Sequence, residues 1–422
     1  MNGSKGVRAA AGALVFAAGL ALAAPAARAE DPVSSWMFGS QWGAGDSPDG
    51  VAVDASGNIY IVGTTGGNLG GKFKGANDAF VIKLDADGNI LWKRQPGTPW
   101  SDGAFGLTID PVGNVYVVGG TQGAIGDIEH HSAGNNGHLD PFVIKYDATD
   151  GHVLWKRQPG TSTEDWAYSV ASDRAGNVFV VGSTNGALAG AQKGLSDAFV
   201  IKFDADGHYL WKRQPGTVGD EAAWGAATDP AGNVYVVGRS RGGLGGAIKG
   251  ELDGFIIKLD ADGHFLWKRS IGGASSDQAS GVACDEAGNA YVVGDTWFSG
   301  RRHTPYETAW AVKFDGDGHR LWKQTFVDPD ADRDAAAVAA DAEGNIVIVG
   351  RASTHYPYAS WIARVNTDGQ ILWQNVFGIG TTVGDGYGVA VDTAGNAYVA
   401  SRQLLNVGSH QDDFVVLDKY AP

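Results

Sequence analysis

Seven positions in this sequence change from small to charged side chains along an otherwise regular pattern. Each follows a short β-branched run such as "IYIVG" or "VYVVG". In chain order the residues are Thr64, Gly120, Ser183, Arg239, Asp295, Arg351 and Arg402. A guanidinium presents a planar fork of N–H donors that matches a carboxylate, sulfate or phosphate. The later residues therefore predict an anion-binding site; the alternative is that the arginines pair with nearby acids.

Aromatic, arginine and histidine residues gather in two further segments, "DTWFSGRRHTPYETAW" from residue 295 and "RASTHYPYASW" from residue 351. The residues that we expect to bind a ligand there are Trp297, Arg302, His303, His355 and Tyr356. Such a mixture is typical of sites for sugars, aromatic ligands or protein partners. The alternative is that two longer loops pack against each other.

Motifs of common enzymes do not occur in the sequence. We find no nucleophile elbow, phosphate-binding loop or zinc-protease motif. The segment "EHHSAGNNGH" offers Glu129, His130, His131 and His138, but not at a familiar metal-ligand spacing. We therefore predict no metal site and leave open whether the protein is an enzyme.

The elements that must position these residues come from an internal repeat. The motif Asp-x-x-Gly-Asn lies between two short apolar runs, and a variable loop, a run like "AFVIKLD", an Asp-Gly pair and a run like "ILWKRQ" follow it. It starts at Asp54, Asp110, Asp173, Asp229, Asp285, Asp341 and Asp392. Four short runs punctuated by turn residues predict four β-strands per unit and almost no helix.

The repeated residues predict structural roles. Glycine supplies a positive φ and aspartate caps the backbone in each tight turn. One tryptophan per unit predicts packing between units: Trp36, Trp92, Trp155, Trp211, Trp267, Trp322 and Trp373. An acid before the first run of each unit predicts a cap at the strand entrance and a ring of negative charge at a central channel. These acids are Asp46, Asp102, Asp165, Glu221, Asp277, Asp334 and Asp385.

The two ends of the chain distinguish a closed propeller from a linear array of small sheets. The seventh unit ends at "DDFVVLDKYAP" without a tryptophan strand, and the N-terminal "SSWMFGSQWG" supplies one that aligns Trp36 with Trp92. A ring closed by pairing the N-terminal strand into the last unit leaves no open sheet edge. We therefore predict an all-β, seven-bladed β-propeller with four antiparallel strands per blade.

The repeat "GVAVDASGNIYIVGTT…DAFVIKLDADGNILWKRQPG" resembles the bacterial secreted seven-bladed β-propeller repeat family called SBBP. The resemblance covers essentially all of the chain after residue 29. It implies a single propeller domain over residues 30–422, and it implies little about function, because the roles in that family are mostly unassigned.

Two cofactors are considered for the Asp-Gly turns, and neither is predicted. A calcium loop of the EF type needs a longer run of oxygen ligands ending in an acid, whereas strand residues follow "LDADGN". The spacing of Asp147, Gly151 and Trp155 is similar to the tryptophan-docking signature of pyrroloquinoline-quinone dehydrogenases. Those enzymes typically have eight blades and ligand-bearing insertions. Calcium and pyrroloquinoline quinone stay open as alternatives.

The first 29 residues are expected to be a signal peptide. Lys5 and Arg8 precede an apolar stretch, and Ala27-Arg28-Ala29 is a small-x-small cleavage site. We expect a periplasmic or extracellular protein without a lipid anchor or membrane span. The formal net charge of −15 disfavours nucleic acid as a partner. The single cysteine, Cys284, forms no internal disulfide, and we expect it to be a small buried residue in a monomer.

All length variation falls in the loops after the second strands and in the linkers between units, which a propeller places on one face. Variable loops on a rigid scaffold are where binding residues concentrate. We therefore predict a non-catalytic binding or scaffold module for a glycan, an anionic small molecule or an envelope protein. The alternative is a periplasmic lyase, hydrolase or quinoprotein-like oxidoreductase with its site in the central funnel.

Overall fold

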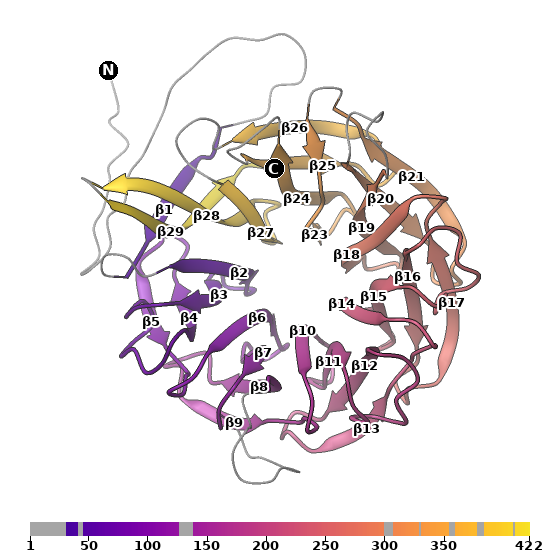
Figure 1. Ribbon diagram of the computed structural model, residues 1–422. Coiled ribbons are helices and arrows are strands. Elements are labelled where there is room, and N and C mark those ends of the chain that lie inside the picture. Colours follow the sequence, from indigo (N-terminus) through magenta and orange to yellow (C-terminus); the bar gives the residue numbers. More distant parts are fainter. Residues whose placement is uncertain are drawn as a thin grey trace.

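Seven β-sheets form a closed ring around a central channel (Figure 1). The computed structural model describes residues 31–40, 45–125, 138–298, 307–328, 331–353, 359–377, 384–407 and 410–422. Each sheet is one blade, with antiparallel strands ordered from the channel outward. The predicted seven-bladed propeller is confirmed. Among the residues that the structure describes, no helix has the length and apolar character needed to cross a bilayer.

The inner strands surround the channel (Figure 1). They are β2 (Asp46–Val53), β6 (Asp102–Ile109), β10 (Asp165–Ser172), β14 (Glu221–Thr228), β18 (Ser276–Cys284), β22 (Asp332–Arg333) with β23 (Ala337–Ala340), and β27 (Gly384–Val391). The second strands are β3 (Ile59–Thr65), β7 (Val115–Thr121), β11 (Val178–Thr184), β15 (Val234–Ser240), β19 (Ala290–Trp297), β24 (Ile346–Ser353) and β28 (Ala397–Val407).

The outer half of each blade consists of two more strands. The third strands are β4 (Asp78–Leu84), β8 (Asp140–Tyr146), β12 (Asp197–Phe203), β16 (Asp253–Leu259), β20 (Glu307–Phe314), β25 (Ala359–Val365) and β29 (His410–Tyr420). The outermost strands are β5 (Ile90–Arg94), β9 (Val153–Arg157), β13 (Tyr209–Arg213), β17 (Phe265–Ile271), β21 (Arg320–Phe326), β26 (Ile371–Phe377) and β1 (Ser34–Phe38).

The hydrophobic core lies between blades rather than inside one sheet. Every residue of β4, "DAFVIKL", is buried, because neighbouring blades cover both faces of the strand. One cluster joins Tyr60 and Val62 of blade 1 to Val115 and Val117 of blade 2, and similar clusters recur around the ring. The outermost strands alternate instead; in β5 only Trp92 is buried. Blades that are covered on both faces explain the near-continuous apolar runs of the sequence.

The N-terminal strand completes the last blade, as predicted. Strand β1 pairs antiparallel with β29, and Ser34 lies opposite Lys419 while Phe38 lies opposite Val415. The Trp36 indole N–H then donates to the Asp87 carbonyl of blade 1 at 3.1 Å. Closure therefore joins blade 7 to blade 1 through both backbone pairing and side-chain contact.

A β-bulge interrupts the inner strand of six blades. The register against the second strand shifts around Asp49, Phe105, Tyr168, Trp224, Ser280 and Tyr387. A bulge adds one unpaired residue and changes the direction of the side chains around it. These residues therefore depart from the in-out alternation of the strand at the inner wall of the ring.

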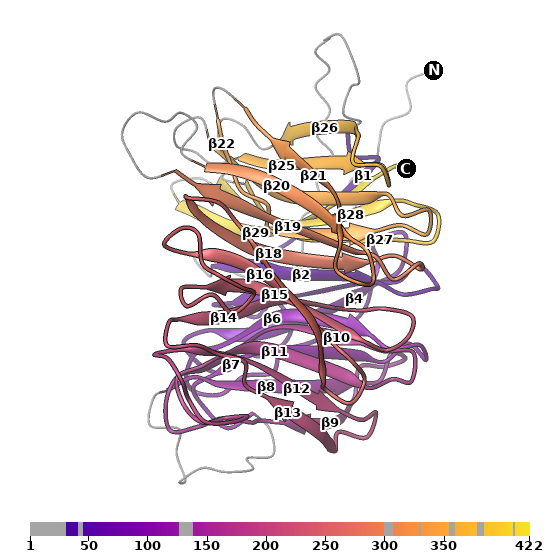
Figure 2. The same cartoon turned by 90° about the vertical axis from the view of Figure 1, so that its right-hand side faces the viewer.

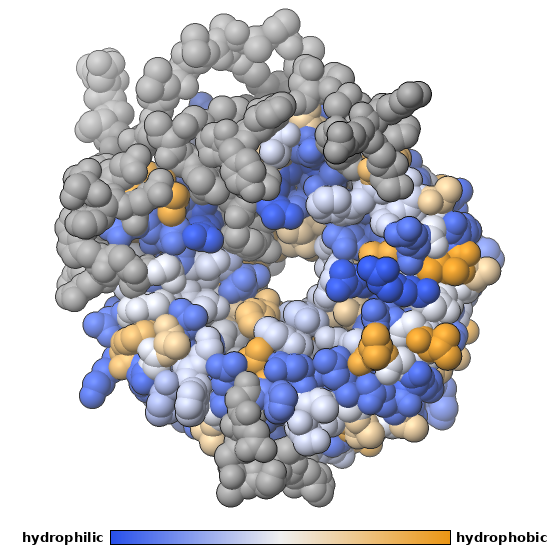
Figure 3. Space-filling model, viewed as in Figure 1, coloured by the Kyte–Doolittle hydropathy of each residue, from blue (hydrophilic) through white to orange (hydrophobic). Residues whose placement is uncertain are grey.

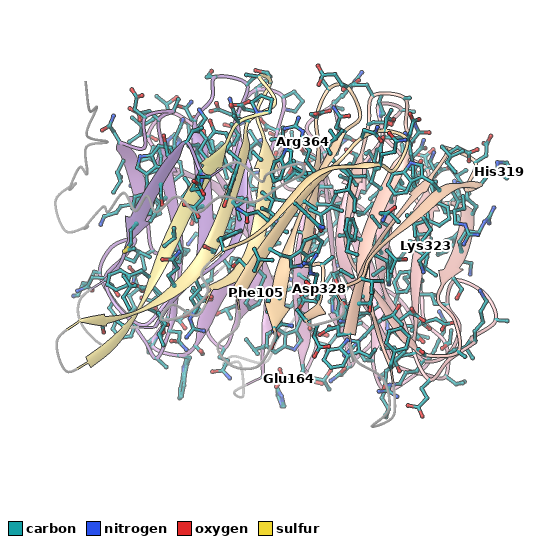
Figure 4. All side chains as sticks on the ribbon, turned by 90° about the horizontal axis from the view of Figure 1, so that it is seen from above. Phe105, Glu164, His319, Lys323, Asp328 and Arg364 are labelled. Carbon is teal, nitrogen blue, oxygen red and sulfur yellow. The ribbon has the colours of Figure 1, made fainter. Side chains whose placement is uncertain are left out.

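The ring has two faces, seen edge-on in Figure 2. We call the face with the second-to-third strand loops and the inter-blade linkers the variable face, and the opposite one the turn face. Glu164, in a linker, lies on the other side of the ring from His319 and Arg364 (Figure 4). Figures 1 and 3 are viewed onto the variable face, where Figure 3 shows the channel open at its centre.

Candidate functional site

The acid at the entrance of each inner strand has a structural role. Asp102 accepts hydrogen bonds from the Thr98 backbone N–H at 2.6 Å and from the Thr121 hydroxyl. Burial of this carboxyl group raises its pKa. The same arrangement recurs at Asp46, Asp165, Glu221 and Asp277, whereas Asp334 accepts hydrogen bonds from the backbone N–H and the guanidinium of Arg351; all five are buried. The Asp385 side chain lies outside the described part of the chain.

The capping role predicted for these acids is confirmed for Asp46, Asp102, Asp165, Glu221 and Asp277. The six described carboxylates are buried under hydrogen bonds, so they do not present free oxygens to a ligand at the channel mouth. The site must therefore come from other residues.

The repeated turn residues also belong to the frame. Asp85 accepts hydrogen bonds from the backbone N–H groups of Asp87 and Asn89 at 3.0 and 2.8 Å. Gly88 has φ of 81°, and a Cβ there would come within 2.0 Å of Trp36. The glycine therefore serves both the turn and the close approach of the tryptophan from the preceding blade. The predicted turn and packing roles are confirmed.

Blade 2 carries one extra residue in this turn, and two aspartates and a histidine lie close together there. The ligand atoms of Asp147, Asp150 and His152 lie within 4.8 Å of one another, and His152 Nδ1 is 2.7 Å from Asp150 Oδ1. Asp150 and His152 are exposed. Trp155 of the docking-like spacing packs on Gly207 of blade 3, as the equivalent tryptophans do on their neighbours.

A buried ion pair inside each of blades 1 to 6 is a feature that the sequence reasoning missed. Lys258 Nζ lies 2.9 Å from Asp229 Oδ2, donates to the Gly316 carbonyl of the next blade at 3.1 Å and sits over the Tyr235 ring. Equivalent pairs are Lys83–Asp54, Lys145–Asp110, Lys202–Asp173, Lys313–Asp285 and Arg364–Asp341. The signal was the charged residue inside each apolar third strand.

The residues that differ between blades meet in pairs at the channel mouth. The bulge residue of the inner strand contacts the variable residue of the second strand in the same blade. In blade 1 the neighbouring Thr64 side chain lowers the pKa of Asp49, in blade 3 the neighbouring Ser183 lowers that of Tyr168, both against the larger effect of burial, and in blade 4 Arg239 lies over Trp224. In blade 2 a Cβ on Gly120 would touch the Phe105 ring at 3.4 Å.

Three of these side chains, together with Trp166, lie on the inner strands of blades 2 to 4; we define Phe105, Trp166, Tyr168 and Trp224 as the aromatic arc. The Phe105 ring centroid is 5.9 Å from Trp166 and 6.5 Å from Tyr168. Trp166 and Tyr168 are stacked, 6.1 Å apart with an interplanar angle of 5°. All four are half-buried and lie on strands that surround the channel (Figure 1). Phe105 lies in the half of the ring nearer to Glu164 (Figure 4).

Arg239 extends the arc with a positive charge. Its guanidinium carbon is 4.7 Å from the centre of the Trp224 ring, a cation–π contact. The side chain is exposed. In the part of the chain that the structure describes, Arg239 forms no ion pair.

Blade 5 contributes a pair of carboxyl groups, Asp295 and Glu307. Gln278 donates to Asp295 Oδ1 at 3.1 Å, and the Glu307 backbone N–H donates to Asp332 Oδ1 at 3.2 Å. Burial raises the pKa of both carboxyl groups, and the charge of Asp295 raises that of Glu307 further. The buried Asp295 Oδ2 and Glu307 Oε1 have no other partner. A proton shared between the two carboxyl groups would satisfy both oxygens.

The structure brings together only part of the predicted site. Arg351 pairs with Asp334 at 2.5 Å and Arg402 with Asp413 at 2.9 Å. Arg351 and Arg402 therefore pair with nearby acids, which was the alternative to anion binding, and they do not extend the arc. Trp297 is 48% exposed and lies opposite Glu307 in the sheet. The predicted Arg302, His303, His355 and Tyr356 lie outside the described residues.

The aromatic arc was missed because its members lie in the inner strands, which were interpreted as frame. The sequence did contain a signal. When the repeats are aligned, the position directly before the small residue that opens "GVAV" changes from blade to blade, whereas its neighbours stay small or apolar. The residues at this position are Asp49, Phe105, Tyr168, Trp224 and Ser280. Glu307 was missed in the same way. At the start of the third strand, Glu307 occupies the position that is Asn77, Leu139, Ser196 or Leu252 in the first four blades.

At the turn face, the residues around the channel line a hollow. Asp110, Asp173, Asp229, Asp285 and Cys284 line it. Cys284 is half-buried rather than buried, and burial raises the pKa of its thiol well above the usual value. A thiol held protonated is a poor nucleophile.

Comparison with protein families supports the architecture. The family model described as Beta-propeller repeat, SBBP, matches residues 42–70, 91–127, 154–188 and 266–300. The first match covers the two inner strands of blade 1, and each later match runs from the outermost strand of one blade through the two inner strands of the next, so that together they reach blades 1 to 5.

Sequence similarity extends to larger proteins. Regulatory protein FlaEY of Caulobacter vibrioides is 28% identical over 246 residues, which are 54% of this chain and 24% of that protein. The uncharacterized WD repeat-containing protein L264 of Acanthamoeba polyphaga mimivirus is 24% identical over 359 residues, 64% of this chain and 26% of that protein. This chain thus spans about a quarter of the length of each relative.

Solved structures with the same architecture include two polysaccharide lyases. Uly1 superposes with a TM-score of 0.51 at 10% identity, over 88% of this chain and 89% of that protein. An ulvan lyase with -[GlcA(1-4)Rha3S]- bound superposes with a TM-score of 0.50 at 11% identity, over 91% and 95%. At these identities the likeness shows the fold alone.

Proposed function

This chain is a seven-bladed β-propeller of the SBBP repeat family, and we propose that it binds a carbohydrate on the aromatic arc at the variable-face mouth of its channel. The observation that carries the proposal is the cluster of half-buried rings formed by Phe105, Trp166 and Tyr168, with Trp224 on the inner strand of the next blade. We also propose that the protein works outside the cytoplasm, following the signal peptide expected from residues 1–29.

Aromatic rings suit a sugar for a physical reason. A pyranose ring presents an apolar C–H face that packs on an aromatic ring, while its hydroxyl groups need hydrogen-bond partners at the edge. Trp224 and Tyr168 combine an apolar body with a polar N–H or O–H. Rings supported by a rigid propeller lose little conformational freedom on binding, which favours affinity.

The frame supports a binding role because it leaves the mouth free to vary. The repeated acids, glycines, lysines and tryptophans are occupied by contacts within and between blades. What differs between blades is the pair of residues at the mouth, and convergent polar and aromatic groups in a concave region are typical of ligand sites.

A glycan array followed by isothermal titration calorimetry tests the proposal. Substituting Tyr168→Ala or Trp224→Ala should weaken binding of a retained glycan about tenfold or more, since each ring supplies a stacking surface. Trp100→Ala is the matched control, because Trp100 is 60% exposed and lies outside the arc. Circular dichroism and thermal unfolding show that each variant is folded.

Two results would overturn this function. One is that the folded wild-type protein retains no glycan on the array. The other is that Trp100→Ala weakens binding as much as Trp224→Ala does, which would place the ligand elsewhere.

Catalysis is the second candidate, favoured by one observation. Asp295 and Glu307 have raised pKa values, and a carboxyl group that stays protonated near neutral pH can act as a general acid. Incubating the bound glycan with the protein and analysing products by mass spectrometry tests this. Cleavage that is lost in Glu307→Gln while binding is kept would support an enzyme; unchanged glycan would leave a binding protein.

A further inference from the structure

Arg239 is an exposed cation at the mouth of the channel whose charge is not neutralised. Its guanidinium lies over Trp224 at 4.7 Å, and no acid among the described residues pairs with it. The side chain also donates no hydrogen bond to another described residue. A guanidinium that stacks on an indole has a fixed plane and keeps its N–H groups available for a planar anion.

Other arginines of the same face are already paired. Arg351 is held by Asp334 at 2.5 Å and Arg402 by Asp413 at 2.9 Å. Arg241, two residues beyond Arg239, lies 3.9 Å from Asp220. In a chain with a formal net charge of −15, acids are plentiful, so an unpaired arginine next to the arc is a specific feature.

The described acids at the channel mouth form no ion pair with Arg239. Glu221, the strand-entrance acid of the same blade, accepts hydrogen bonds from Thr217 and Ser240 and is buried. On the other inner strands, burial raises the pKa of Asp49 to about 7, so this carboxyl group is partly protonated at neutral pH. An anion at the mouth therefore meets less repulsion than the net charge suggests.

We propose that the saccharide bound by the aromatic arc carries a carboxylate or a sulfate ester, and that Arg239 binds this anionic group. The inference rests on the proposed carbohydrate function and adds the class of sugar. Trp224 links the two parts of the site, because one ring both supports the guanidinium and belongs to the arc. Uronic acids and sulfated sugars share this chemistry, a planar or tetrahedral oxyanion on a pyranose ring.

Two matched pairs of probes test the inference by calorimetry. The first is an oligogalacturonate and its methyl ester; the second is a sulfated galactan oligosaccharide and its desulfated form. Each pair keeps the sugar backbone and changes the charge. We expect the wild-type protein to prefer the charged member of at least one pair by about tenfold or more, and raised salt to reduce that preference.

Variants of the two neighbouring arginines locate the effect. Arg239→Gln should abolish the preference and leave affinity for the neutral member unchanged within about twofold. Arg239→Lys should keep part of it, since a lysine retains charge but not the planar fork. Arg241→Gln is the matched control: it changes the net charge equally but removes an arginine that is paired with Asp220.

The outcomes separate this inference from the proposed function. Equal affinity for both members of each pair, or equal effects of Arg239→Gln and Arg241→Gln, overturns the anion site and leaves carbohydrate binding intact. Preference for only the carboxylate or only the sulfate identifies the class. Failure of the wild-type protein to bind any member overturns the inference, and the glycan array then decides whether carbohydrate binding fails with it.

Discussion

The indole of Trp36 lies against Gly88, so that the last blade of the ring touches the first through one tryptophan and one glycine. The Trp36 N–H donates to the Asp87 carbonyl at 3.1 Å, and a Cβ on Gly88 would come within 2.0 Å of Trp36 Nε1. The same contact recurs between consecutive blades, for example Trp155 on Gly207. Closure of the ring therefore reuses the contact that joins the consecutive blades from blade 1 to blade 6.

Gly88→Ala should destabilise the protein by more than strain at a positive φ explains. Alanine at φ of 81° costs about 1–2 kcal/mol, and crowding of Trp36 adds about 1–3 kcal/mol. Gly232→Ala is the matched control, since Gly232 has the same φ and open space around it. Guanidinium-chloride unfolding measures both losses, and equal values would contradict the role of Trp36 in closure.

Lys258→Met should cost about 3–5 kcal/mol of unfolding free energy, because Asp229 is left as an uncompensated buried charge. Burial alone would raise the pKa of Asp229, but hydrogen bonds from Asn233 and Lys258 keep that pKa below its usual value. The variant should therefore raise it. Lys268→Met, an exposed lysine of the same blade, should change stability by less than about 0.5 kcal/mol.

The double variant Lys258→Met/Asp229→Asn gives a second check on this pair. Removing both charges should recover much of the loss, since no buried charge then remains. A double variant as unstable as Lys258→Met would show instead that packing of the lysine stem dominates. Chemical unfolding at pH 7 decides between the two.

Glu307→Gln should make stability less dependent on pH above about pH 5. Burial and the charge of Asp295 raise the pKa of Glu307 in the folded state, so the native protein holds a proton that the unfolded chain has lost. Where the native state binds more protons, stability falls as pH rises. Glutamine keeps a hydrogen-bond donor without ionising, so the variant should gain on the wild type toward pH 9.

Urea unfolding between pH 5 and 9 measures this difference. The exposed Glu343 provides the control, because Glu343→Gln should leave the pH profile unchanged. Parallel profiles for the wild type and Glu307→Gln would show that the two carboxyl groups of blade 5 share no proton.

Asp418→Asn should stabilise the protein at pH 7 and above. Asp418 is buried opposite Ser35 where blade 1 has Ile82, and burial raises its pKa to about 6. The stability of Asp418→Asn relative to the wild type should therefore rise by about 3 kcal/mol as pH rises between about 4 and 6. Thermal unfolding of both proteins across this range measures the change. A difference between the two that stays constant from pH 4 to 6 would contradict it.

The fold was predictable because every frame residue occurs several times. Because the glycines, the capping acids and the packing tryptophans recur at the same position of each repeat, they can be distinguished from residues that occur only once. The N-terminal strand with Trp36, which has no repeat of its own, shows how the ring closes. The ion pair of Lys258 with Asp229 was not predicted, since the two residues lie on different strands and the sequence does not give their separation.

The candidate site was predicted less completely, because its residues depend on backbone register. Arg239 was identified from a column that changes between blades, whereas Tyr168 and Trp224 were not. A bulge shifts them out of the regular alternation of the strand, so counting residues assigns them to the wrong side. The outcome for Arg351 depended on the distance to Asp334, which only coordinates provide.

The pairing of one bulge residue with one second-strand residue in each blade has a consequence for how such a protein diversifies. Phe105 with Gly120, Tyr168 with Ser183 and Trp224 with Arg239 are alternative fillings of one position, held by the same surrounding blade. Two substitutions in one blade therefore alter recognition locally, without changing the repeated tryptophan, glycine and lysine contacts that join the blades. A gene built from duplicated repeats thus inherits several separately adjustable specificity elements on a common support.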